Sequence, residues 1–98
     1  MSLGDKRRKF TEMIALTIQY ALFLGYKISF DKEHCNHMEN SLHYEGLAKD
    51  FNLYKDGKYL TKTEDHEPVG LFWEFLGGSW GGRFQDGNHY SCEWMGRK

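Results

Sequence analysis

The sequence predicts one small α+β domain, with two helices and a small antiparallel sheet. The chain has 98 residues, which is enough for a single domain spanning positions 1–98. Apolar residues recur at helical spacing near its start and again after Pro68. Short runs with the alternation of strands lie between and after these segments, separated by turn residues. Because helices and strands do not alternate regularly, as in parallel β/α units, we expect antiparallel strands.

The first helix is predicted from about Asp5 to Leu24. Asp5 is a candidate N-cap, and Gly25 offers a left-handed stop at the C-terminal end. The apolar side of this helix follows i, i+3, i+4, i+7 spacing through Phe10, Met13, Ile14, Thr17, Ile18, Ala21 and Leu24. The alternating segment Tyr26–Phe30 then predicts a strand, and the polar positions 31–40 predict a loop.

The second half of the chain contains one clear hairpin. Leu47–Tyr54 alternates as a strand does, and the two-residue turn Asp56-Gly57 connects it to a returning strand over 58–60. In chain order, the remaining expected elements are a helix from Glu67-Pro68 to Leu76 that ends at Gly77-Gly78, a glycine-rich loop over 80–88 and a strand over 89–94.

Charge and segment composition exclude several classes of protein. The net charge is −1, so we expect no nucleic-acid partner. Basic residues before the first apolar segment are similar to a secretory signal, but Glu12 and Gln19 interrupt that segment and no cleavage site follows. The apolar run is also too short to span a bilayer, so we expect no stable membrane association. Cys35 and Cys92 allow one disulfide, but nothing in their spacing demands it, so we expect two reduced thiols.

Two histidines and an aspartate stand in two segments that carry candidate metal ligands. His43 and Asp50 are seven residues apart, so both reach one ion only if the chain turns between them, as Gly46 permits. His89 follows the turn residues Asp86–Asn88. Each segment alone is typical of an ordinary turn beside a strand. Together, two imidazoles and a carboxylate form the ligand set of a catalytic zinc, which keeps a fourth position for water.

The paired segments resemble a zinc peptidase family that contains D-alanyl-D-alanine carboxypeptidases and dipeptidases and the phage L-alanyl-D-glutamate endolysins. The family pattern is Ser-x-His-x-x-Gly-x-Ala-x-Asp, then Trp-Gly-Gly, then Glu or Asp-x-x-His and an aromatic residue. The resemblance extends over about residues 10–94. The matching residues are Ser41, His43, Gly46, Ala48, Asp50, Trp80, Gly81, Gly82, Asp86, His89 and Tyr90.

The resemblance implies a fold and a metal centre. The fold would be Hedgehog/DD-peptidase-like, with one Zn²⁺ per chain bound by His43, Asp50 and His89. Asp86 would be the catalytic base, which takes a proton from the attacking water and passes it to the leaving amine. Such a site keeps a net positive charge, which favours the activation of water near neutral pH.

The substrate contacts implied by the resemblance are less complete. Ser41 matches the family pattern and is expected to contact the substrate. Family members usually carry an arginine upstream of this serine that helps to hold the substrate carbonyl. This chain has no arginine between Tyr26 and Ser41. We expect His37 or Lys32 to take its place, with His37 the nearer to the motif.

The activity implied by the resemblance is hydrolysis of a peptide bond in peptidoglycan stem peptides, which are the expected partners. Either the L-Ala–D-Glu bond or the D-Ala–D-Ala bond would be cut, by a phage or prophage lysin. Without a signal peptide, the protein is expected to be made in the host bacterial cytoplasm and to act on the cell wall after release. The alternative is a catalytically weak, zinc-containing domain that binds the wall or belongs to the virion, as the missing arginine would allow.

Overall fold

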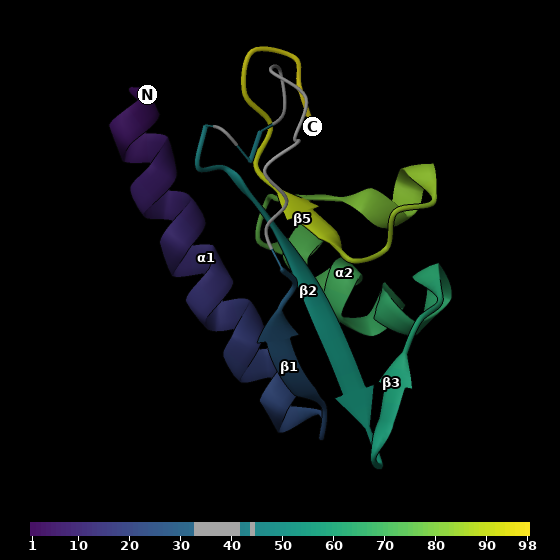
Figure 1. Cartoon of the computed structure of the whole chain (residues 1–98). Coiled ribbons are helices and arrows are strands. Elements are labelled where there is room, and N and C mark those ends of the chain that lie inside the picture. The colour runs from purple at the N-terminus through teal and green to yellow at the C-terminus, as the bar shows by residue number, and fades with distance from the viewer. Residues whose placement is uncertain (33–41, 44) are drawn as a thin grey trace.

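The computed structural model describes residues 1–32, 42–43 and 45–98. Two helices and an antiparallel sheet of five strands are present, which confirms the α+β prediction (Figure 1). In chain order the elements are α1 (Leu3–Phe23), β1 (Lys27–Phe30), β2 (Ala48–Lys55), β3 (Lys58–Leu60), α2 (Glu67–Phe75), β4 (Ser79–Trp80) and β5 (His89–Ser91), with short 3₁₀ turns at Thr63–His66 and Gly81–Phe84.

Strand β2 is the centre of the sheet. Strand β1 pairs with one edge of β2, from Lys27 opposite Tyr54 to Phe30 opposite Phe51. The other edge of β2 is shared by β5, which pairs over 48–50, and by β3, which pairs over 53–55. Strand β4 pairs with the outer edge of β5. The chain therefore leaves a gap between β3 and β5 beside the middle of β2, as Figure 1 shows.

The helices cover one face of this sheet. Phe51 and Tyr90 are fully buried on that face, and their rings lie 4.9 Å apart. Trp73 of α2 packs edge-on against Tyr90 and against Phe10 of α1. Because neighbouring residues of a strand point to opposite faces, Asp50 and His89 lie on the face away from the helices. Within the described part of the chain, neither helix combines the length and apolar character needed to cross a membrane.

Three predicted boundaries were wrong. Asp5 is not the N-cap of α1, because Ser2 caps the helix: its hydroxyl accepts from the Asp5 N–H, and the Asp5 carboxylate accepts from the Ser2 N–H. The final strand ends at Ser91 rather than at position 94, because Trp94 pairs with Arg97 across a tight turn. The predicted glycine-rich loop over 80–88 contains the end of β4 and a 3₁₀ turn.

Candidate metal centre

Asp50 and His89 face each other across two paired strands. His89 is the first residue of β5 and lies opposite Asp50 of β2 in the strand register. Residues opposite one another in antiparallel strands project on the same side, so pairing of β2 with β5 brings their side chains together. Phe84 packs over the His89 ring at 5.8 Å, and 11% of the His89 side chain is exposed.

His43 reaches the same place from the turn before β2. The His43 carbonyl accepts from the Gly46 N–H at 3.2 Å, and Leu47 donates to Leu42. Gly46 has a φ of +72°, a left-handed conformation that a side chain would strain. Arg7 of α1 donates to the Glu45 carbonyl at 2.6 Å. The turn that the sequence predicted at Gly46 is therefore present, and α1 holds it in place.

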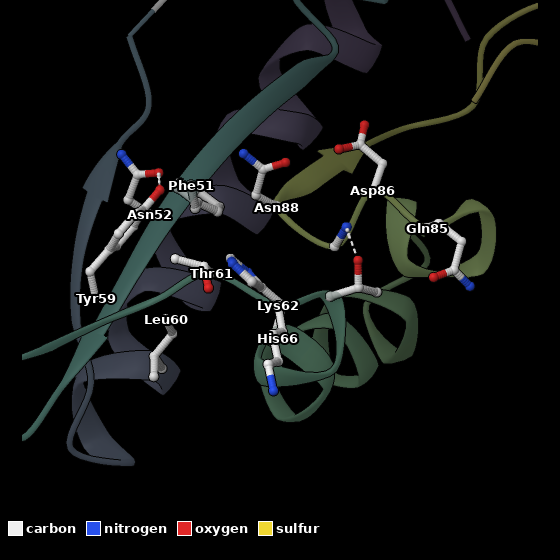
Figure 2. Close-up of a pocket in the computed structure, with 12 residues that line it drawn as sticks. Phe51, Asn52, Tyr59, Leu60, Thr61, Lys62, His66, Gln85, Asp86 and Asn88 are labelled. Atoms are coloured by element: carbon white, nitrogen blue, oxygen red, sulfur yellow. Dashed lines mark hydrogen bonds between the residues drawn. The ribbon is translucent and has the colours of Figure 1, made fainter.

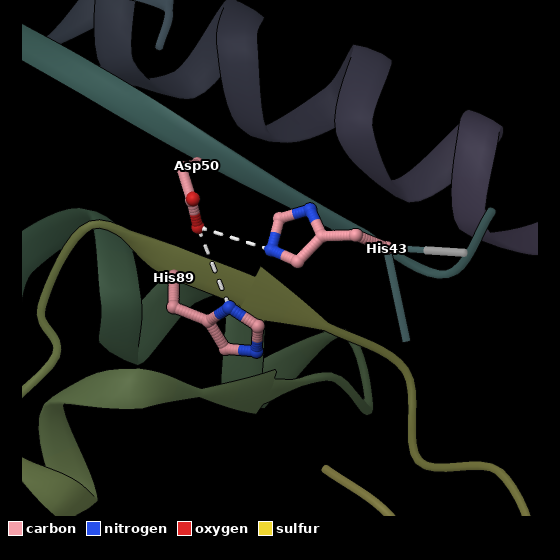
Figure 3. A group of neighbouring side chains, drawn as sticks. All are labelled: His43, Asp50 and His89. Atoms are coloured by element: carbon pink, nitrogen blue, oxygen red, sulfur yellow. Dashed lines mark ion pairs between the residues drawn. The ribbon is translucent and has the colours of Figure 1, made fainter. Parts of the chain in front are cut away.

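Three donor atoms converge at this point, as Figure 3 shows. Asp50 Oδ1 lies 3.5 Å from His43 Nε2 and 3.4 Å from His89 Nδ1. All three ligand atoms lie within 4.8 Å of one another, so the group could hold a metal ion. The cluster combines residues from a turn, from β2 and from β5, which the sequence placed in two separate motifs.

The charge balance of the cluster also fits a cation. Burial alone would raise the pKa of the Asp50 carboxyl, but the facing His43 and His89 rings outweigh burial and keep this pKa well below its usual range. Asp50 Oδ1 is buried and accepts a hydrogen bond from no residue that the structure describes. A buried ionised oxygen that only two imidazole nitrogens face, at 3.4 and 3.5 Å, is stabilised further by a cation bound between the three side chains. The donor set thus suits a metal in both chemistry and position.

Asp86 lies three residues before His89, and hydrogen bonds of its backbone fix its position. Its carbonyl accepts from the His89 N–H at 3.0 Å, and its N–H donates to the Gly81 carbonyl at 2.9 Å. A Cβ at Gly81 would overlap the Asp86 carbonyl, so a larger residue would push this loop away. The Trp-Gly-Gly motif therefore fixes the position of Asp86, and the exposed carboxylate is not among the three grouped donors.

The next residue, Gly87, is fixed on both sides. Its N–H donates to Thr63 Oγ1 at 3.2 Å, and its carbonyl accepts from Trp80 Nε1 at 2.7 Å. Thr63 lies in the 3₁₀ turn before α2, more than twenty positions away in sequence. The loop that carries both Asp86 and His89 is thus clamped between two other parts of the fold.

A polar pocket of about 230 Å³ lies beside Asp86, in the gap between β3 and β5 (Figure 2). Asn52 lines it two residues along β2 from Asp50, and two residues on one face of a strand lie about 7 Å apart. Sequence reasoning missed this pocket. The other described residues that line it include Phe51, Tyr59, Leu60, Thr61, Lys62, Thr63, His66, Gln85, Gly87 and Asn88.

His66 is a buried histidine outside the metal cluster. Its Nδ1 lies 2.8 Å from the hydroxyl of Tyr90, the residue after His89 in β5. Burial lowers the pKa of His66 to about 4 and raises that of Tyr90 above its usual range, so both groups are neutral at neutral pH. The sequence offered no periodic pattern that marked His66 as buried, since it precedes the second helix rather than lying on its apolar side.

We expect acid to destabilise the protein through His66. In the unfolded chain His66 takes up a proton near pH 6.5, whereas in the folded chain it does so only near pH 4. The contribution of neutral His66 to the free energy of unfolding is therefore present above pH 6.5 and is lost as the pH falls to 4. At about 1.4 kcal/mol per pKa unit, the loss reaches about 3 kcal/mol. Urea unfolding of metal-free wild type and His66→Gln at several pH values measures this. If the free energy of unfolding of the two proteins changed with pH in the same way, His66 would not be the cause of the acid sensitivity.

Two predicted substrate contacts, Ser41 and His37, lie outside the described residues, and so does Cys35. Lys32 is exposed after β1, and its N–H donates to Asp31 Oδ1 at 2.8 Å. Cys92 is buried, with its Sγ 3.7 Å from Met13 Sδ.

In comparisons with known proteins, no protein-family model matches the chain, and no curated protein matches it.

Proposed function

We propose that this chain is a zinc peptidase that hydrolyses a peptide bond in the stem peptides of peptidoglycan. One observation carries the proposal: His43, Asp50 and His89 present two nitrogens and one oxygen to a common point. These are three protein ligands of the kind that a catalytic zinc uses, with a fourth position left open. The resemblance of the two motifs to zinc peptidases of the cell wall supports the same activity.

The spacing of the donor atoms is compatible with zinc. Zinc–nitrogen and zinc–oxygen distances of about 2.0–2.1 Å in a tetrahedron place neighbouring ligand atoms about 3.3–3.4 Å apart. The separations of 3.4 and 3.5 Å from Asp50 Oδ1 to the two imidazole nitrogens agree with this, and the ligand nitrogens of His43 and His89 lie within 4.8 Å of each other. When bound, zinc would supply Lewis acidity, which activates water and polarises the substrate carbonyl.

Asp86 would then move the proton. The attacking water loses a proton to the Asp86 carboxylate as its oxygen bonds to the peptide carbonyl carbon. Asp86 returns that proton to the leaving nitrogen as the C–N bond breaks, which yields a carboxylate and an amine. Two features favour this role: the Asp86 carboxylate is exposed, and hydrogen bonds to Gly81 and His89 tie its backbone to the third ligand.

The substrate class within this proposal rests on the resemblance. Two bonds of the stem peptide are candidates, the L-Ala–D-Glu bond and the D-Ala–D-Ala bond. Cleavage of either would suit a phage or prophage lysin, which must open the wall of its host.

Purified muropeptides test the proposal directly. Zinc-loaded protein is incubated with muropeptides of defined stem length, and the products are identified by mass. A new amino terminus on D-Glu or the release of D-Ala supports the peptidase and identifies the bond. His89→Ala serves as the control that lacks a ligand. Absence of cleavage by the zinc-loaded protein would refute the peptidase, and binding to intact sacculi without cleavage would favour the wall-binding alternative.

A further inference from the structure

Asn88 extends across the face of β2 that carries Asp50. Its backbone carbonyl accepts from the Phe51 N–H at 2.9 Å, on the edge of β2 that pairs with β5. Its side-chain Nδ2 donates to Asp31 Oδ2 at 3.4 Å. Asp31 follows β1 on the opposite edge, and its N–H donates to the Asp50 carbonyl at 2.7 Å. Asn52, which shares the Asp50 face of β2, donates to the same Asp31 carboxylate, so the bond from Asn88 crosses β2 on this face, near Asp50.

Asp31 also determines which way this carboxamide points. An ionised carboxylate only accepts hydrogen bonds, so the NH₂ group of Asn88 faces Asp31 and Oδ1 faces away. In Figure 2 the Asn88 oxygen is turned toward the side on which Asp86 lies. Within the described part of the chain, no donor reaches Asn88 Oδ1, whereas the equivalent oxygen of Asn52 accepts from the Tyr59 hydroxyl at 3.1 Å.

Asn88 and Asp86, each with an acceptor oxygen, thus line one pocket, which Asn52 connects to the face of β2 that carries Asp50. We propose that Asn88 accepts a hydrogen bond from the N–H of the scissile peptide bond. This inference rests on the proposed peptidase activity. As the C–N bond breaks, the leaving nitrogen takes its new proton from Asp86 on its lone pair. Asn88 gains and loses no proton, and holds the existing N–H so that the lone pair is directed at Asp86.

A pair of substrates that differ only in the group at the scissile bond tests this role. One is a stem-peptide analogue, and the other is the depsipeptide in which oxygen replaces the scissile N–H. For Asn88→Ala we expect kcat/KM on the amide to fall about 10-fold, the usual scale of one hydrogen bond, with kcat/KM on the ester unchanged. A general structural disturbance would lower both rates together, and that result would overturn the inference.

Asn52→Ala is the matched control. Asn52 Nδ2 also donates to Asp31, at 3.4 Å, so its loss loosens the same carboxylate without removing the acceptor beside Asp86. We expect the amide-to-ester ratio of Asn52→Ala to equal that of the wild type. A ratio that falls equally in both variants would assign the effect to Asp31 rather than to Asn88, and would overturn the inference.

Binding gives a second readout that needs no turnover. In zinc-loaded Asp86→Asn, adding Asn88→Ala should weaken binding of the amide about 10-fold and leave binding of the ester unchanged. If the wild type cleaves neither substrate, the peptidase proposal fails, and the binding ratio alone decides whether Asn88 contacts the N–H. If the wild type cleaves the amide and neither ratio changes in Asn88→Ala, only the Asn88 inference fails.

Discussion

Asp86→Asn is expected to keep its zinc and to lose about 10²–10⁴-fold in kcat on stem peptides, the usual scale of general acid–base catalysis. The carboxamide keeps the shape of the side chain but cannot take up the proton of the attacking water. The loop should persist, because the backbone of Asp86, through Gly81 and His89, holds it in place. Zinc stoichiometry by elemental analysis and single-substrate kinetics on muropeptides measure the two effects separately.

Asp56→Asn is a matched control for this change. It removes the same charge from the turn between β2 and β3, where Asp56 has a φ of +53° that asparagine also tolerates. Both zinc content and turnover should stay at the wild-type level. A zinc-loaded Asp86→Asn protein with wild-type turnover would remove Asp86 from the mechanism, and would show that its role is to shape the turn before β5.

His43→Ala and His89→Ala are each expected to lose bound zinc. Either change leaves two of the three converging donors, and the metal should then dissociate during dialysis. In the wild type, zinc at 100 times its Kd stabilises the fold by about 2.7 kcal/mol. Removal by a chelator should therefore lower Tm by about 10–20 °C for a domain of this size. The chelator should leave the Tm of both variants unchanged.

His66→Gln is the matched histidine control, because His66 is buried outside the cluster. This variant should retain one zinc per chain. If His43→Ala and His89→Ala also retained a full equivalent, the ligand assignment would be wrong.

Local patterns in the sequence were sufficient to predict the architecture. The apolar periodicity of α1 and the Asp56-Gly57 turn each depend on residues close together in the chain, and both were found where predicted. The convergence of His43, Asp50 and His89 was also foreseen, because two motifs with a shared chemistry carry them. Helix ends were less certain, since the Ser2 cap competes with an equally suitable Asp5 nearby.

The supporting contacts of the site could not be read from the sequence. Asn88 bonds to Asp31 across β2, and Gly87 bonds to Thr63, and each pair joins segments that meet only in the folded chain. An asparagine or a threonine in a polar segment is compatible with many turns, so neither carries a signal of its partner. The pocket depends on β3 and β5 sharing one edge of β2, which is a property of the topology rather than of any motif.

The pairing of β2 with β5 also has a consequence for the order of folding. The β2–β3 hairpin closes through a two-residue turn, and such hairpins form in about 1–10 μs. The ladder of 48–50 with 89–91 instead requires a long loop to close, which is entropically costly and slow. The three donors therefore meet only after this late step. A metal bound there would stabilise the native state more than the folding transition state, so it would slow unfolding and leave the rate of folding nearly unchanged.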